Sequence, residues 1–152
     1  MSGEIFAHKF KVAKGQDLVE TALSATDYPS SGSFIDVGKC ERFHVLVHWG
    51  TIDASDTPVI EIKQATAADG TLTSINTTYC KHTAAGNDDG EFVLFTVETK
   101  KLTEDYAYVA AVVSAVTNGS YGDIVFLLPE TEVPVTQATA VCPSASQHEH
   151  VG

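Results

Sequence analysis

The amino-acid sequence predicts an all-β domain, an antiparallel β-sandwich or barrel of jelly-roll-like form with extended N- and C-terminal arms. Three observations lead to this fold class. Apolar and polar residues alternate with a period of two in the clearest segments, tight-turn residues separate these segments at short intervals, and helical periodicity is scarce. About seven or eight strands fit this spacing, which is typical of a sandwich or a barrel.

The clearest element is residues 41–49, which read E-R-F-H-V-L-V-H-W. Alternate positions from Phe43 to Trp49 are apolar and would face the interior, whereas His44 and His48 lie on the opposite face. The two histidines are four positions apart, roughly 13 Å along a strand, which is too far for both to bind one metal ion. We therefore predict a strand with one buried face and two partly exposed histidines.

Further strands are predicted along the rest of the chain. Residues 57–65 mix apolar and charged positions as an edge strand does, and the following Asp69-Gly70 indicates a hairpin turn. Residues 106–116 are almost continuously apolar, which is typical of a central strand covered on both faces. The other predicted elements are strands at residues 72–79, 91–98 and 121–128 and a tight turn at Asn118-Gly119.

The predicted β domain covers residues 1–130 and includes an N-terminal arm. Residues 131–152 are expected to be an extended or disordered C-terminal arm, because they contain Pro, Thr and Ser without periodicity. Residues 16–25 fit a short helix or an extended segment equally well. The chain has 152 residues, 43% of them hydrophobic and 19% charged, which is enough to bury one core.

The chain is acidic, with a formal net charge of −11. A surface of this sign repels phosphate backbones and anionic lipid headgroups, so neither nucleic acid nor a membrane is an expected partner. No apolar run in the sequence approaches the length of a membrane-spanning helix. The first residues lack the basic and then apolar layout of a signal peptide, and synthesis in a cytoplasm is therefore expected.

No motif in the sequence carries chemistry by itself, and we predict no catalytic residue, no cofactor and no metal site. The protein is expected not to be an enzyme, with a small hydrolase that uses loop carboxylates as an alternative. Carboxylates are paired at residues 53 and 56, 88 and 89, and 104 and 105, where turn formation is the expected role. The three cysteines, Cys40, Cys80 and Cys142, are predicted to be buried thiols, with a Cys40–Cys80 disulfide as the alternative.

Three segments resemble the patterns of one family. Residues 32–50 resemble the pattern "xxID-xxx-YxxxxxxVxxG", and residues 60–70 resemble "VxVxxQATxxDG". Tyr106-Ala107-Tyr108-Val109 follows "YRYV", except that Ala107 replaces the Arg. Over residues 34–128 the chain thereby resembles the capsid decoration, or cement, proteins among the small head proteins of tailed bacteriophages.

The resemblance implies a viral structural protein that stabilises the head by binding the outer surface of major capsid subunits. It also implies a homo-oligomer, expected as a homotrimer, on the outer capsid surface of the virion after synthesis in the host cytoplasm. The two arms would supply contacts by strand addition. The predicted partner-binding residues are Ile5, Phe6, Phe10, Val12, Val133, Val135 and Val141.

An alternative function of a different class is a carbohydrate-binding or receptor-binding β-sandwich module of a phage virion. Exposed aromatic side chains near loops would mark such a module, because aromatic faces stack on sugars and on partner side chains. The candidates are Tyr28, Tyr79 and Tyr121.

Overall fold

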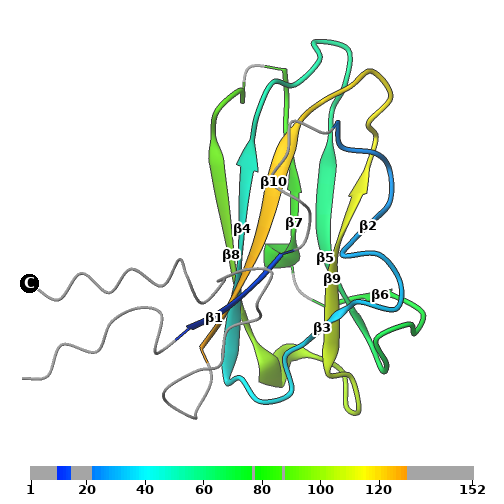
Figure 1. Cartoon of the computed structure of the whole chain (residues 1–152), viewed down its shortest axis with the longest axis vertical. Helices are drawn as coiled ribbons and strands as arrows, with labels where there is room; N and C mark the ends of the chain where they lie inside the picture. Colours follow the sequence, from blue (N-terminus) through cyan, green and yellow to red (C-terminus); the bar gives the residue numbers. More distant parts are fainter. Residues whose placement is uncertain (1–9, 15–21, 77, 87, 130–152) are drawn as a thin grey trace, which may run out of the picture.

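The computed structural model describes residues 10–14, 22–76, 78–86 and 88–129, with the backbone alone in residues 10–14. Over these residues two antiparallel sheets pack face to face as a β-sandwich (Figure 1). The four-stranded sheet contains, in spatial order, β1 (Phe10–Lys14), β10 (Gly122–Pro129), β4 (Arg42–Trp49) and β8 (Phe92–Glu98). The six-stranded sheet contains β2 (Asp27–Tyr28), β3 (Ile35–Asp36), β9 (Tyr108–Ser114), β5 (Val59–Ala65), β6 (Thr73–Ser74) and β7 (Lys81–Thr83).

Two of the strands in the six-stranded sheet are interrupted. β2 and β3 pair with successive parts of β9, and β6 and β7 pair with successive parts of β5. If β2 and β3 are counted as one interrupted strand, and β6 and β7 as another, each sheet has four strands. The described chain then crosses from one sheet to the other at every connection except the β5–β6 hairpin. This eight-stranded order is that of a jelly roll, which confirms the predicted fold class.

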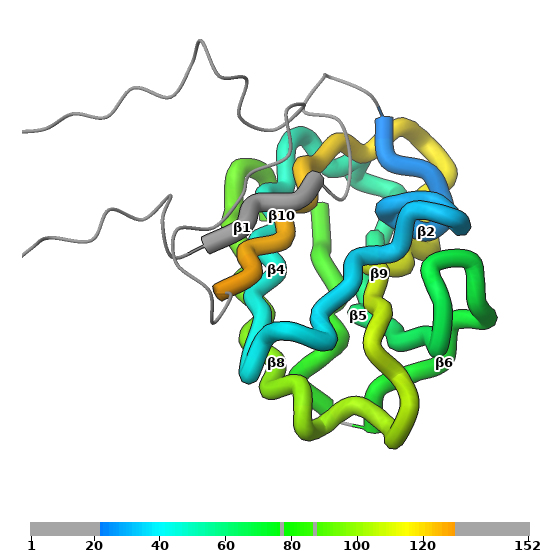
Figure 2. The backbone as a smooth tube through the Cα atoms, turned by 60° about the horizontal axis from the view of Figure 1, so that its bottom comes forward, coloured from blue at the N-terminus to red at the C-terminus, as the bar shows by residue number. Residues whose placement is uncertain are grey.

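The two sheets form separate layers (Figure 2). The core lies between their inner faces. In β4 every second side chain is buried, and the positions between them are half-exposed, so the strand predicted at residues 41–49 is confirmed. β9 and β5 contribute the facing apolar side chains. The largest fully buried side chains are Trp49, Phe43, Phe126, Ile60, Ile62, Ile124 and Leu128.

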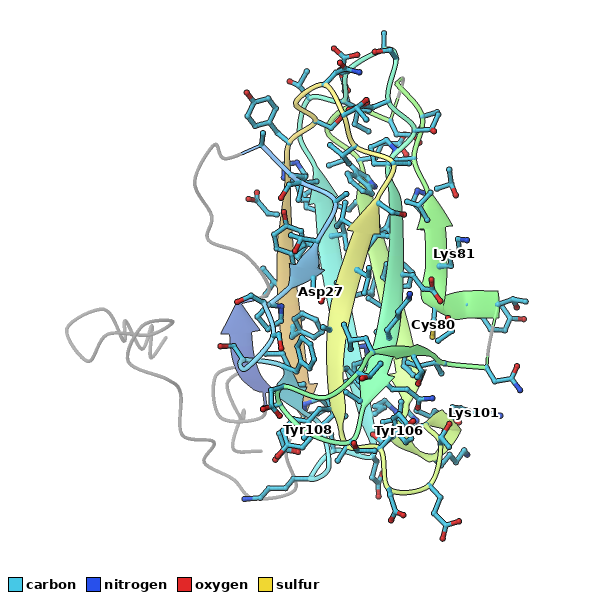
Figure 3. All side chains as sticks on the ribbon, turned by 90° about the vertical axis from the view of Figure 1, so that its right-hand side faces the viewer. Asp27, Cys80, Lys81, Lys101, Tyr106 and Tyr108 are labelled. Atoms are coloured by element: carbon cyan, nitrogen blue, oxygen red, sulfur yellow. The ribbon has the colours of Figure 1, made fainter. Side chains whose placement is uncertain are left out.

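The outer face of the six-stranded sheet has a small apolar cluster of its own. Phe34, Ala65 and Ala110 are buried there, and Tyr108, labelled in Figure 3, packs against them. The loop before β3 is held over this face because Gly32 N–H and Phe34 N–H both donate to Ala68 O, at 2.9 and 3.2 Å. β9 is therefore central and covered on both faces at this level, as its continuous apolarity predicted.

Two sequence expectations were wrong in position or extent, and a third is described only in part. β5 is not an edge strand, because β9 lies on one side of it and β6 and β7 on the other. The single strand expected at residues 72–79 is the short β6 followed by a 3₁₀ helix, η1 (Thr78–Cys80). Of residues 16–25, only 22–25 are described; they contain no helix, and Ala22 forms an isolated bridge with Tyr121.

The N-terminal residues expected to form an arm lie partly in the sandwich. β1 pairs with β10 over its whole length, and the register sets Phe10 opposite Pro129 and Val12 opposite Leu127. This part of the chain is thus a strand of the four-stranded sheet and not an arm. Ile5, Phe6, Val133, Val135 and Val141 lie outside the described residues, as does the whole C-terminal arm at residues 131–152.

Candidate functional site

The outer face of the four-stranded sheet carries a group of apolar side chains that we call the outer apolar patch. Phe92 and Leu94 in β8 are 65% and 58% exposed, which is unusual for side chains of this size in a core-forming strand. Beside them in the sheet, Leu46 stands opposite both Leu94 and Val125. The patch consists of Leu46, Phe92, Leu94, Val125 and Leu127, the three not in β8 being half-exposed.

Polar residues at both ends of the patch organise its border. His48 stacks on Phe92 with the ring centroids 4.5 Å apart, and its Nδ1 lies 3.4 Å from Asp123 Oδ2. At the other end, His44 Nδ1 lies 2.9 Å from Thr96 Oγ1. Burial and then the nearby Arg42 charge lower the pKa of His44, which keeps its ring neutral at physiological pH. The two histidines are partly exposed polar positions, as predicted.

An exposed apolar centre with a polar border is the composition of a protein-binding surface. The sequence contains a signal for it. Residues 92–95 read F-V-L-F and residues 124–128 read I-V-F-L-L, so both faces of these strands are apolar although only one can face the core. We predicted partner contacts in the two arms, and the outer apolar patch was not among the predicted sites.

A second cluster joins two loops at one end of the sandwich, and Asp56 is its centre. The Asp56 carboxylate is 2% exposed and accepts hydrogen bonds from two backbone N–H groups, of Thr117 and Asn118, both at 3.1 Å. It also accepts from Thr117 Oγ1 at 2.7 Å, Ser120 Oγ at 3.0 Å and Asn118 Nδ2 at 3.2 Å. Desolvation acts to raise the pKa of Asp56, but these donors outweigh it and lower the pKa to about 2.

The Asp56 carboxylate is therefore ionised and fully engaged in holding the loop after β4 to the loop before β10. The other carboxylates also serve loops. Asp88 accepts from Ala85 N–H at 2.8 Å, and Asp89 accepts from Ile52 N–H at 2.7 Å. Asp53 and Asp88 thus have the expected turn role, whereas Asp56 and Asp89 connect separate loops.

The cysteines follow the first of the two expectations. Cys40 and Cys80 are both buried thiols, so the alternative disulfide between them is wrong. Burial, together with the charge of Glu61, raises the pKa of the Cys80 thiol to about 11, which makes this thiol a poor nucleophile. Cys142 lies outside the described residues.

The tyrosines proposed for carbohydrate binding have different environments. Tyr79 in η1 is 82% exposed and Tyr121 before β10 is 39% exposed. Tyr28 in β2 is half-buried against the core, and its hydroxyl lies 2.9 Å from Ser24 N, from which it accepts a hydrogen bond. Tyr28 thus has a local structural role, which leaves two exposed aromatic side chains on separate elements.

Within the described ranges, no group of three or more His, Cys, Asp or Glu side chains is arranged to hold a metal ion. Across the same residues, no helix has the length and apolarity needed to cross a membrane. By its topology and its core the protein is a jelly-roll β-sandwich. No protein-family model, no curated protein and no solved structure matches the chain significantly.

Proposed function

We propose that the protein is a capsid decoration protein of a tailed bacteriophage, a structural and not a catalytic component. It binds the outer surface of major capsid subunits and stabilises the head. The observation that carries this proposal is the outer apolar patch, because contiguous exposed apolar side chains on a folded domain mark sites of protein contact. The jelly roll is compatible with the role without being specific to it, since viral capsid and lectin domains share this fold.

Binding through this patch would bury its leucine and valine side chains at the centre of the contact. The His48–Asp123 pair would remain in the polar border, where it contributes to specificity more than to affinity. Many copies of a capsid site occur on one head, so a modest affinity at each site suffices for dense coverage. The charge of −11 would keep decorated heads apart in solution.

A lysine in place of Val125 tests the patch. Val125 is half-exposed in the middle of the patch, and burying an unpaired ammonium group there on binding is costly. The Val125→Lys protein is expected to bind undecorated heads at least ~10-fold more weakly than the wild type. Co-sedimentation of the labelled protein with purified heads measures the affinity, and electron microscopy of the particles locates the density.

Val112→Lys is the matched control, because Val112 is also half-exposed in a central strand, on the outer face of the other sheet. It is expected to leave head binding unchanged. Equal weakening by both substitutions, or wild-type binding by Val125→Lys, contradicts the assignment of the patch. Wild-type density inside the shell or on the tail contradicts the proposed function itself.

The predicted contacts of Val133, Val135 and Val141 need a separate measurement. A chain that ends at residue 130 keeps every strand that the structure describes. It is expected to unfold at the wild-type temperature and to bind heads more weakly, because residues 131–152 would supply the additional contacts. Thermal unfolding followed by circular dichroism and the same co-sedimentation assay test both parts, and full head binding by the shortened chain removes the arm from the proposal.

A further inference from the structure

We propose that β8 pairs with β8 of a second copy of this chain, antiparallel and across a two-fold axis, so that two four-stranded sheets continue into one another. The pairing concerns the edge of the sheet and not the outer apolar patch as such. It does not depend on the proposed function, because self-association can be measured without capsids.

β8 differs from every other edge strand that the structure describes. It is seven residues long without a break, and it forms one border of the four-stranded sheet (Figure 1). The edges of the other sheet are interrupted strands of two or three residues. β1, at the opposite border, is shorter and reads F-K-V-A-K. Natural proteins protect edges with lysine, proline or brevity, and the F-V-L-F-T-V-E of β8 has none of these protections.

The backbone hydrogen bonds between β8 and β4 determine which N–H and C=O groups of β8 face outward from the edge of the sheet. Trp49 N–H donates to Glu91 O at 2.8 Å, and Thr99 N–H donates to Glu41 O at 2.9 Å. The register between these two points is unbroken, so the odd-numbered residues of β8 bond to β4. The N–H and C=O groups of Phe92, Leu94, Thr96 and Glu98 therefore point away from the sheet.

A pocket lined by Tyr79, Thr96 and Lys101, among others, lies along the lower half of this edge, where η1 is the neighbouring element. In an antiparallel pair of β8 strands centred on Phe95, Leu94 of each copy stands opposite Thr96 of the other. The outward N–H and C=O groups of both residues then bond across the two-fold axis.

Charge complementarity identifies a second copy, in this orientation, as the occupant. Asp88, Asp89 and Glu91 precede β8 at one end of the sandwich, and Lys101 follows it at the other end, next to Lys100, which pairs with Glu98 at 3.1 Å. Lys101 is exposed near the lower end in Figure 3. An antiparallel pair brings the acidic end of each β8 beside the basic end of the other, whereas a parallel pair would align like charges.

The mass of the full chain in solution tests the pairing. Light scattering or sedimentation over rising concentration is expected to show a species of twice the 16.2 kDa chain. Lys101→Glu should raise the dissociation constant of the pair ~10-fold or more, because it places an acidic side chain beside the acidic end of the other copy. Adding Glu91→Lys to the same chain restores the complementarity and should restore the pair.

Lys63→Glu is the matched control, since it makes the same charge change on the outer face of the six-stranded sheet, and it should leave the mass unchanged. Amide hydrogen exchange gives an independent readout. The Leu94 and Thr96 amides should exchange more slowly as the wild-type concentration rises, and they should not do so in Lys101→Glu. A single-chain mass at all concentrations, a three-chain mass, or a pair indifferent to both charge changes would overturn the pairing.

Discussion

Replacing Phe126 by alanine is expected to lower the free energy of unfolding by about 3–5 kcal/mol. Phe126 is fully buried in β10, between β1 and β4 in the four-stranded sheet. Removing its ring takes away apolar burial and leaves a cavity that the two packed sheets cannot easily close. Urea or guanidinium unfolding at neutral pH, followed by tryptophan fluorescence of the buried Trp49, measures the loss.

Phe92→Ala is the control for this substitution, because Phe92 lies in the same sheet but is 65% exposed. Removing its ring exposes little new apolar surface and should cost less than about 1 kcal/mol. A similar loss from both substitutions would mean that the two faces of the sheet are equally buried. That result would contradict the sandwich as the arrangement of the core.

Replacing Asp56 by alanine is expected to lower the unfolding temperature by about 5–10 °C, among the largest effects of a polar substitution in this chain. Both oxygens of its carboxylate accept from donors of Thr117, Asn118 and Ser120. Asp56→Asn should lose nearly as much as Asp56→Ala, because one oxygen becomes an NH₂ group that faces other donors. Asp53→Asn is the control, since the Asp53 carboxylate accepts from the neighbouring Ser55.

The same carboxylate predicts a dependence of stability on pH. Its pKa falls from an ordinary 3.8 to about 2 on folding, so the folded state favours the ionised form. The stabilisation is fully present above the unfolded pKa and is lost as the pH falls through the folded pKa. Between about pH 4 and pH 2 the wild type should therefore lose stability more steeply than Asp56→Ala in denaturant titrations. Parallel slopes would show that Asp56 is not held by these donors.

The alternation of apolar and polar residues made β4 predictable, and the continuous apolarity of residues 106–116 made β9 predictable. The position of β5 was not, because Glu61 and Lys63 on its outer face give it the composition of an edge strand. Its neighbours in the sheet come from distant parts of the chain, and no local pattern encodes them. The interruptions in these strands could not be predicted either, since a Thr-rich segment such as residues 72–79 is compatible with a strand and with a turn.

The candidate sites also differ in whether a local sequence pattern encodes them. The apolar outer face was visible in the sequence as consecutive apolar residues in β8 and β10. The sequence did not show which of the two faces of these strands packs in the core, and the structure does. The role of Asp56 was not visible, because its donors lie 61 to 64 residues further along the chain. Turn residues such as Asp56 and Asn118 are common in loops, and only the folded chain brings these two together.

The pairing of β1 with β10 has a consequence for how the protein is made. β1, the first strand that the structure describes, pairs with β10, the last described one, more than a hundred residues later, so the four-stranded sheet cannot be completed before Pro129 has been made. Closing such a long loop is entropically slow, and sandwiches of this contact order fold in milliseconds to seconds. Nascent chains still attached to the ribosome should consequently show β1 unprotected against proteases until Pro129 has emerged.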